Sequence, residues 1–111
     1  MFIMFYDFKL FQHDQLRRHT MTSLVIVELT PIDKTKLTEY STLAAETLKP
    51  FNGRFIAKGE VEALYGEAIH PMKAVIEFPN KESAKNWYNS GAYQAIIPLR
   101  EKGMKCQFHL V

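Results

Sequence analysis

The sequence predicts an α+β fold: a ferredoxin-like β-α-β-β-α-β sandwich with an antiparallel sheet. Three observations lead to this prediction. Short β-branched or alternating segments recur along the chain, segments of helical periodicity separate them, and 111 residues leave room for one hydrophobic core. An order of two βαβ-like halves places both helices on one side of the sheet.

The first half of the pattern begins with an apolar, β-branched segment. Residues 23–29 (SLVIVEL) predict a strand, and a turn at Pro31 follows it. Asp33 is the expected N-cap of a helix, because its carboxylate can accept from the first unpaired backbone N–H groups. Apolar residues then recur at helical spacing until Pro50 stops the helix, at Leu37, Tyr40, Ala44 and Leu48.

The middle of the chain predicts three extended segments. Residues 54–58 (RFIAK) form the second strand, which Gly59 is expected to break or bulge. Extended structure is expected to resume over residues 61–65 (VEALY), as an extra short strand. A loop over residues 66–71 then leads to the next main strand, residues 73–78.

The C-terminal part predicts two helical segments and a last strand. Asn80 and Ser90 are the expected caps of the two helical segments. Pro98 is expected to kink or end the second segment, because proline lacks a backbone N–H and clashes with the preceding turn. Gly103 ends the helical region, and residues 105–111 (KCQFHLV) alternate as a terminal strand.

Alternation along the strands predicts two different sheet faces. One side of each strand is apolar and should meet the helices, as Phe55 and Ala57 do in the second strand. The other side forms a mixed face of Leu24, Ile26, Glu28, Arg54, Ile56, Lys58, Val75, Glu77, Gln107 and His109. An open antiparallel sheet with one wet side is the simpler interpretation. We expect instead a second copy of the chain to cover this face, since an exposed aliphatic patch tends to become an interface.

Residues 1–20 do not match the remainder of the chain. They are rich in aromatic residues and lack the basic start and small-residue cleavage site of a secretion signal. Two interpretations stay open: an N-terminal extension outside the domain, produced by an early start codon, or an arm that packs on a neighbour's apolar surface. In both cases the ferredoxin-like domain is expected to span residues 21–111.

Composition and motif content exclude several classes of function. A net charge of +2 with scattered basic residues does not suit a nucleic-acid-binding protein. No apolar run approaches the ~20 residues of a membrane span. The single cysteine, Cys106, allows no internal disulfide and fits a cytoplasmic location. The sequence holds no phosphate-binding loop and no histidine spacing typical of a metal site, so neither a cofactor nor a metal is expected.

Candidate site residues come from the mixed face and from the aromatic helix. Glu28, Arg54, Glu77 and His109 lie on different strands and could converge. A carboxylate beside His109 could act as a general base, whereas carboxylates beside Arg54 could instead form an ion network at a dimer interface. The aromatic residues of the helical region either cap a pocket mouth or fill the core: Trp87, Tyr88 and Tyr93.

From about Ser23 to the C-terminus, several segments in this order resemble one known family. They are Gly53-Arg54-Phe55, Ala74-Val75-Ile76-Glu77-Phe78-Pro79, Trp87-Tyr88 followed by Tyr93-Gln94, and Ile97-Pro98-Leu99-Arg100. The chain resembles the family called domain of unknown function 1330, within the dimeric α+β barrel superfamily. It departs from the family pattern at Ala68, where a Trp is usual, and at Ser90-Gly91-Ala92-Tyr93, where the family often has Ser-Pro and an acidic residue before Tyr.

The resemblance implies a ferredoxin-like subunit that pairs sheet to sheet into a barrel, and it implies no established reaction. The superfamily includes cofactor-free monooxygenases, lactone isomerases and haem-degrading enzymes, so the fold alone does not select a chemistry. We expect a cytoplasmic homodimer that binds a small organic molecule in a cavity on the mixed sheet face. The alternative is a cofactor-independent enzyme, of monooxygenase or isomerase type, with Glu77 or His109 as base and Arg54 holding an anion.

Overall fold

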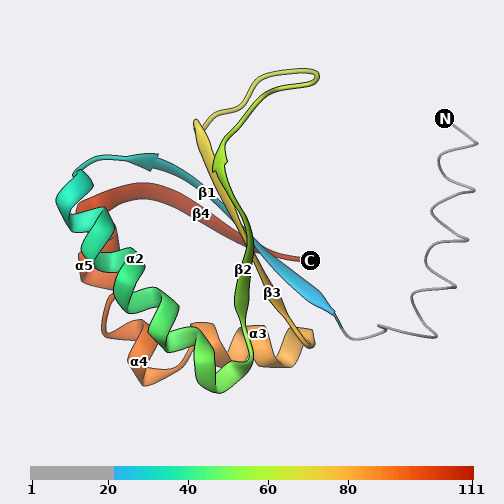
Figure 1. The fold of residues 1–111 in the computed structure, drawn as a ribbon, viewed down its shortest axis with the longest axis vertical. Helices are drawn as coiled ribbons and strands as arrows, with labels where there is room; N and C mark the ends of the chain where they lie inside the picture. The colour runs from blue at the N-terminus through green and yellow to red at the C-terminus, as the bar shows by residue number, and fades with distance from the viewer. Residues whose placement is uncertain (1–21) are drawn as a thin grey trace, which may run out of the picture.

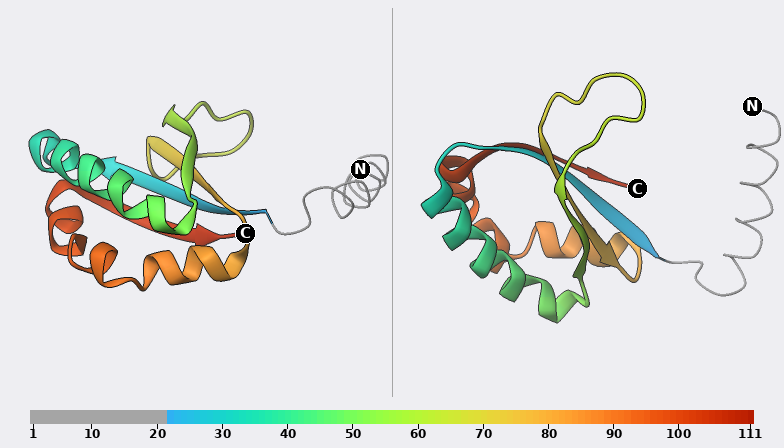
Figure 2. Two further views of the ribbon diagram at one scale, coloured as in Figure 1. Left: turned by 60° about the horizontal axis from the view of Figure 1, so that its bottom comes forward. Right: turned by 45° about the horizontal axis from the view of Figure 1, so that its top comes forward.

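The computed structural model describes residues 22–111 (Figure 1). The elements run in the order β1 (Ser23–Pro31), α2 (Lys34–Leu48), the 3₁₀ helix η1 (Lys49–Phe51), β2 (Arg54–Glu60), β3 (Met72–Phe78), α3 (Lys81–Tyr88), α4 (Gly91–Gln94), α5 (Ile97–Gly103) and β4 (Met104–Leu110). The strands pair antiparallel in the order β2-β3-β1-β4. The helices cover one face of this sheet (Figures 1 and 2). The predicted ferredoxin-like α+β sandwich is therefore confirmed.

Three helices begin at residues whose side chains accept a hydrogen bond from the first turn. Asp33 accepts from the Lys36 backbone N–H at 3.1 Å, and Asn80 accepts from that of Ser83 at 2.7 Å. The Ser90 hydroxyl accepts from the Tyr93 N–H at 3.2 Å. Each cap satisfies a backbone donor that the helix itself leaves unpaired, as the sequence predicts.

The core lies between the helices and the sheet. Alternate residues of β1 and β3 are buried there, which confirms the predicted apolar side of both strands. They pack against buried residues of α2, α3 and α4, so that the core holds Val25, Val27, Leu29, Ala74, Ile76, Phe78, Tyr40, Ala44, Leu48, Ala84, Trp87 and Tyr93. Gly103 is the last residue of α5, where that helix meets α2. Glycine suits this position because a Cβ atom would lie 2.9 Å from the Leu37 backbone nitrogen.

A β-bulge in β2 changes the predicted faces of that strand. Phe55 pairs with Ile76, but Ala57 rather than Ile56 pairs with Val75. One extra residue reverses the alternation for the rest of the strand, because side chains change face at every step. Lys58 therefore lies on the helix side and Ala57 on the other, opposite to the prediction. The predicted break at Gly59 is also wrong, since β2 continues to Glu60.

The extra strand predicted over residues 61–65 is absent from the described part of the chain. The ladder between β2 and β3 ends at the pair of Glu60 with Met72. The Val61 backbone N–H still donates to the Pro71 carbonyl oxygen at 2.8 Å, but no ladder continues from there. Residues 61–71 instead form a loop that projects from the sheet, which we call the β2–β3 arm (Figure 1). A hydrogen bond of 2.8 Å between His70 Nδ1 and Thr30 Oγ1 ties its base to β1. Its tip exposes Leu64, Tyr65 and Ile69.

Pro98 does not end a helix. Helix α4 stops at Gln94, and α5 begins at Ile97 with the proline in its first turn. A missing backbone N–H costs no hydrogen bond at that position, and the fixed φ angle of proline suits the first turn. The helical region therefore continues past Pro98 to Gly103, where the sequence predicts its end. The end of β1 also differs from the prediction, because the strand includes Pro31, where the sequence predicts a turn.

Candidate functional site

The sheet face turned away from the helices carries the charged residues predicted from the sequence. We call it the open face; its residues are Leu24, Ile26, Glu28, Arg54, Ala57, Lys73, Val75, Glu77, Gln107 and His109. Arg54 and Glu77 are cross-strand partners at its edge. The Arg54 Nη2 and Nε atoms both donate to Glu77 Oε1, at 2.8 and 2.9 Å. The predicted pairing of a guanidinium with a carboxylate is thus present on this face.

The open face does not bring a free carboxylate next to His109. His109 faces Ile26 across β1 and β4, whereas Glu77 faces Leu24 on the other side of β1. At about 4.8 Å between neighbouring strands, Glu77 and His109 are roughly 10 Å apart or more. Glu28 is the diagonal neighbour of His109, but its carboxylate lies 3.3 Å from Lys73 Nζ on the opposite side. Both carboxylates therefore have a cationic partner within the chain.

The three aromatic candidates lie on the helix side, away from the charged set. Trp87 and Tyr93 are 1% and 0% exposed, and Tyr88 is half-buried. The Trp87 indole N–H donates to the Thr47 hydroxyl at 2.9 Å. Its ring centroid lies 4.4 Å from that of Tyr93. These rings form the core between the helices and the sheet, and two cavities open beside them.

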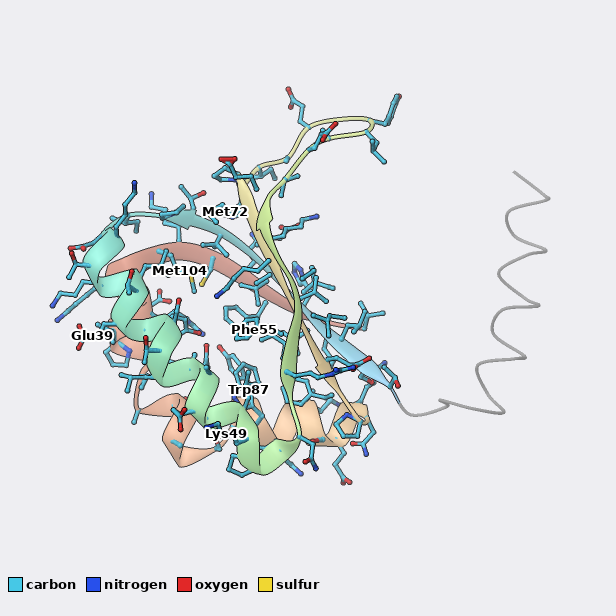
Figure 3. The ribbon with its side chains drawn as sticks, in the orientation of Figure 1. Glu39, Lys49, Phe55, Met72, Trp87 and Met104 are labelled. Atoms are coloured by element: carbon cyan, nitrogen blue, oxygen red, sulfur yellow. The ribbon has the colours of Figure 1, made fainter. Side chains whose placement is uncertain are left out.

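The first cavity lies between α2 and the sheet and has a volume of about 390 Å³. We call it the α2 cavity. Phe55, Met72, Met104 and Trp87 gather in the space between α2 and the strands (Figure 3). The polar residues in its lining come mostly from α2, with Thr38 and Ser41 among them, and the strands add Lys58 of β2 and Lys73 of β3. The Lys58 Nζ atom lies 4.8 Å from the centroid of the Phe55 ring, a cation–π contact that holds the ammonium group beside the apolar wall.

Two tyrosine hydroxyl groups and Arg100 form a hydrogen-bonded chain next to the α2 cavity, which Tyr40 lines. The Tyr40 and Tyr93 hydroxyl oxygens are 2.6 Å apart, and Arg100 Nη1 donates to the Tyr93 hydroxyl at 3.1 Å. Burial raises the pKa of Tyr40 far above its usual range and also raises the pKa of Tyr93. Both phenols are therefore neutral at physiological pH, and their hydroxyl groups serve as hydrogen-bonding groups within the core.

The second cavity, of about 430 Å³, lies between α3 and the C-terminal strand. We call it the β4 cavity. It shares Trp87 and Phe108 with the α2 cavity, so these two rings contribute to both walls. Its other lining residues include Lys85 of α3, Arg100 of α5, and Cys106 and the predicted candidate His109 of β4. Burial raises the pKa of the Cys106 thiol, which disfavours the reactive thiolate.

Sequence reasoning missed both cavities. It assigned the inward side chains of β4 to the core, but Cys106, Phe108 and Leu110 are only half-buried because β4 is an edge strand. Strict alternation predicts Lys58 on the open face, whereas the bulge turns it to the helix side. The available signal was Arg100 within the Ile97–Arg100 segment, a cation in an otherwise apolar stretch.

Residues 22–111 contain neither a metal-binding cluster nor a helix that could span a membrane. Within residues 22–111, no three His, Cys, Asp or Glu side chains come together in a way that could hold a metal ion. Over the same range, every helix is too short or too polar to cross a lipid bilayer. Predictions made for residues 1–20 lie outside the described part of the chain.

Comparison with known proteins supports the family assigned from the sequence. The model of the family described as domain of unknown function (DUF1330) matches residues 22–111. No curated protein matches the chain significantly.

Solved structures share the fold at low sequence identity. A protein of unknown function from Rhodopseudomonas palustris superimposes with a TM-score of 0.68 at 10% identity, over 89% of this chain and 88% of that one. A dimeric protein of unknown function with a ferredoxin-like fold, from Bacteroides fragilis, gives 0.52 at 18% identity, over 81% and 94%. SnoaB, a cofactor-independent oxygenase from Streptomyces nogalater, gives 0.54 at 8% identity, over 82% and 91%. These likenesses establish a ferredoxin-like fold.

Proposed function

This chain belongs to the DUF1330 family, and on that premise we propose that it binds a small, mostly apolar organic molecule in the α2 cavity. The observation that carries the proposal is the cavity itself. Its volume of about 390 Å³ falls within the roughly 300–1,000 Å³ of small-molecule sites, and such sites combine apolar walls with a few polar groups. Here the walls are Phe55, Met72, Met104 and Trp87, and the polar groups lie towards α2 and Lys58.

The lining also indicates the kind of molecule. Aromatic rings and the soft thioether side chains of Met72 and Met104 suit a flat apolar body. Lys58 supplies a positive charge beside Phe55. A phenol or an aromatic molecule with one oxygen substituent matches this combination, with its ring among the apolar side chains and its oxygen near the ammonium group.

We propose further that two copies of the chain pair through the open face, in the cytoplasm. Leu24, Ile26 and Val75 supply aliphatic surface there, and Arg54–Glu77 and Glu28–Lys73 supply ion pairs. A closed C2 pairing removes such a surface from water. The dimeric ferredoxin-like protein from Bacteroides fragilis supports this arrangement by analogy of fold. A polar cavity enclosed by Glu28, Arg54, Glu77 and His109 between the two copies belongs to the same proposal.

The second candidate function is a cofactor-independent oxygenase or isomerase with Glu77 or His109 as base. The likeness to the Streptomyces nogalater oxygenase supports it at the level of fold. The pairing of Glu77 with Arg54 favours binding over catalysis, because the guanidinium already occupies one oxygen of that carboxylate with two hydrogen bonds. Oxygen consumption by the protein in the presence of a bound phenol would favour the enzyme.

Ligand binding is tested by filling the α2 cavity. Ser41 lines it from α2, so Ser41→Trp should occupy the space that the ligand needs. The matched control is Glu39→Trp, an exposed position of the same helix outside the lining. A thermal-shift screen of phenols and small aromatic molecules should find compounds that raise the Tm of the wild type and of Glu39→Trp, but not that of Ser41→Trp. Equal shifts in all three proteins, or no shift with any compound, would contradict the proposal.

Pairing is tested separately by placing a charge on the open face. Ile26→Lys introduces an unpaired cation at its centre and should lower the mass in light scattering from two chains to one. Ile32→Lys changes an exposed position outside the sheet and should leave the mass unchanged. A wild-type protein that is already monomeric at micromolar concentration would rule the pairing out.

A further inference from the structure

We propose that the β4 cavity is a second binding site, which takes a small organic carboxylate with an apolar body. The site is distinct from the α2 cavity, and the inference does not depend on the function proposed above. Its binding group is Arg100, assisted by Lys85, and its apolar wall is formed by side chains of β1, α3 and β4.

Arg100 is held in place before any ligand arrives. Its side chain is only 11% exposed. The Nη1 atom donates to the hydroxyl oxygens of Tyr88 and Tyr93, at 3.0 and 3.1 Å. The guanidinium carbon lies 5.0 Å from the centroid of the Phe108 ring, within the range of a cation–π contact. A guanidinium fixed in this way loses little conformational freedom on binding an anion.

Some N–H donors of the Arg100 guanidinium also have no acceptor within residues 22–111. Its Nε atom donates to Glu101 at 3.0 Å, and Nη1 is used by the two tyrosines. The Nη2 atom makes no hydrogen bond within residues 22–111, and it is not counted among their buried unsatisfied atoms. Its N–H groups are therefore accessible on a residue that lines the cavity. Only an acceptor from outside the described chain can use them.

The charge of the lining selects an anion. Lys85 and Arg100 both contribute to it, whereas no Asp or Glu of residues 22–111 does. Glu101 binds the guanidinium from outside the lining, on a side chain that is mostly exposed. A mostly buried cation whose carboxylate partner is largely in water can gain from a second anion at its free donors.

The apolar lining residues favour a ligand whose anionic group is attached to an apolar ring or chain. Val25, Trp87, Phe108 and Leu110 supply the apolar part of the lining, which also holds the polar residues Asn89 and His109. Its volume of about 430 Å³ has room for a ring or a short chain besides a carboxylate. A carboxylate matches the planar donors of a guanidinium, and the apolar wall disfavours the strongly hydrated phosphate ion.

The test is a calorimetric titration of the full chain with benzoate, against its uncharged counterpart benzamide. Benzoate should bind at least about tenfold more tightly, since only the anion forms charge-assisted bonds to Arg100. Inorganic phosphate serves as a third probe and should bind more weakly than benzoate. Benzoate binding no tighter than that of benzamide, or phosphate binding as tight as that of benzoate, would overturn the proposal.

Variants locate the site. Lys85→Gln removes an exposed cation from the lining and should weaken benzoate binding several-fold, whereas Lys81→Gln, on the same helix but outside the lining, should not. Arg100→Lys should weaken it by about tenfold or more, because an ammonium lacks the planar fork of donors. If Arg100→Lys does not fold, the contrast between positions 85 and 81 still decides, and equal affinities there would reject the site.

The proposals for the two sites can be tested independently of each other. Ser41→Trp fills the α2 cavity and should leave benzoate binding unchanged, since Ser41 is absent from the lining of the β4 cavity. A loss of benzoate binding in Ser41→Trp would assign the carboxylate to the α2 cavity and overturn the second site. Phenol shifts without benzoate binding would remove the second site and leave the proposed function intact.

Discussion

The two faces of the sheet handle polar groups in opposite ways. On the helix side, Tyr40, Tyr93 and Arg100 bring polar atoms into a nearly dry core, and hydrogen bonds join them. On the open face, Arg54 and Glu77 keep their charges at an edge that water reaches, with the Arg54 side chain 73% exposed. Polar groups on the helix side therefore contribute more to stability than those of the open face, because a hydrogen bond in the core is costly to break and an exposed ion pair is not.

The largest effect is expected from Phe78→Ala in the core. Phe78 is almost completely buried and its ring centroid lies 5.4 Å from that of Trp87, so truncation leaves a cavity that the rigid neighbours cannot fill. We expect a loss of about 3–5 kcal/mol in the free energy of unfolding, measured by urea denaturation. Ile56→Ala at the bulge, 47% exposed, should cost under about 1 kcal/mol in dilute protein. Similar losses at both positions would show that water does not reach Ile56 in solution.

A smaller loss is expected from Tyr93→Phe, which removes only a hydroxyl group from the core. That hydroxyl bonds to Tyr40 and accepts from Arg100, so both partners lose a buried hydrogen bond. We expect a loss of about 1–3 kcal/mol in the same measurement. Tyr65→Phe removes a hydroxyl from the exposed tip of the β2–β3 arm and is the matched control. A Tyr93→Phe protein as stable as this control would mean that the hydroxyl chain contributes nothing.

High pH should weaken the core through the same tyrosines. Burial raises the pKa of Tyr40 and of Tyr93, so the folded chain holds these protons more tightly than the unfolded chain, whose tyrosines titrate at about 10. The resulting stability is complete below about pH 10 and is lost progressively as the pH rises further. Urea denaturation between pH 8 and 11 checks this slope.

Two variants separate the sources of that slope. Tyr40→Phe should flatten it above about pH 10, because one titrating group is removed. Burial also raises the pKa of Cys106, and an unfolded thiol titrates near 8.5, so Cys106→Ala should remove any decline that begins at lower pH. An unchanged slope in Tyr40→Phe would exclude this phenol as its cause.

The smallest effect on folding is expected from Arg54→Ala on the open face. The Arg54–Glu77 pair is largely exposed, so its loss should cost about 0–1 kcal/mol in the free energy of unfolding. A larger effect on the monomer–dimer equilibrium is expected, since a dimer would bury the pair and leave Glu77 without its partner. If neither stability nor chain association changes, Arg54 is a surface residue without a role in pairing.

Most of the fold follows from local patterns. Strand alternation in residues 23–29 and 105–111, the helical spacing from Leu37 to Leu48, and the caps at Asp33, Asn80 and Ser90 all reflect interactions between near neighbours in the chain. Such signals are readable from sequence because each depends on a few residues.

The incorrect predictions share a physical cause: each concerns a feature that depends on a second segment, distant in the sequence. The bulge at Ile56 is fixed by the pairing of β2 with β3, and residues 61–65 lack a strand beside them. The cavities depend on how far α2 and α3 stand from the sheet, a distance that no local pattern sets. The candidate residues were therefore placed on the correct face in β1, β3 and β4, but their mutual distances were not predictable.

The position of Trp87 has a practical consequence. The chain contains one tryptophan, and its indole belongs to the partition between the two cavities. Intrinsic fluorescence excited at the indole absorption band therefore comes from a single residue, which a ligand in either cavity would contact. The protein carries its own optical reporter, and the spectral change caused by a phenol can be compared directly with that caused by benzoate, without any label.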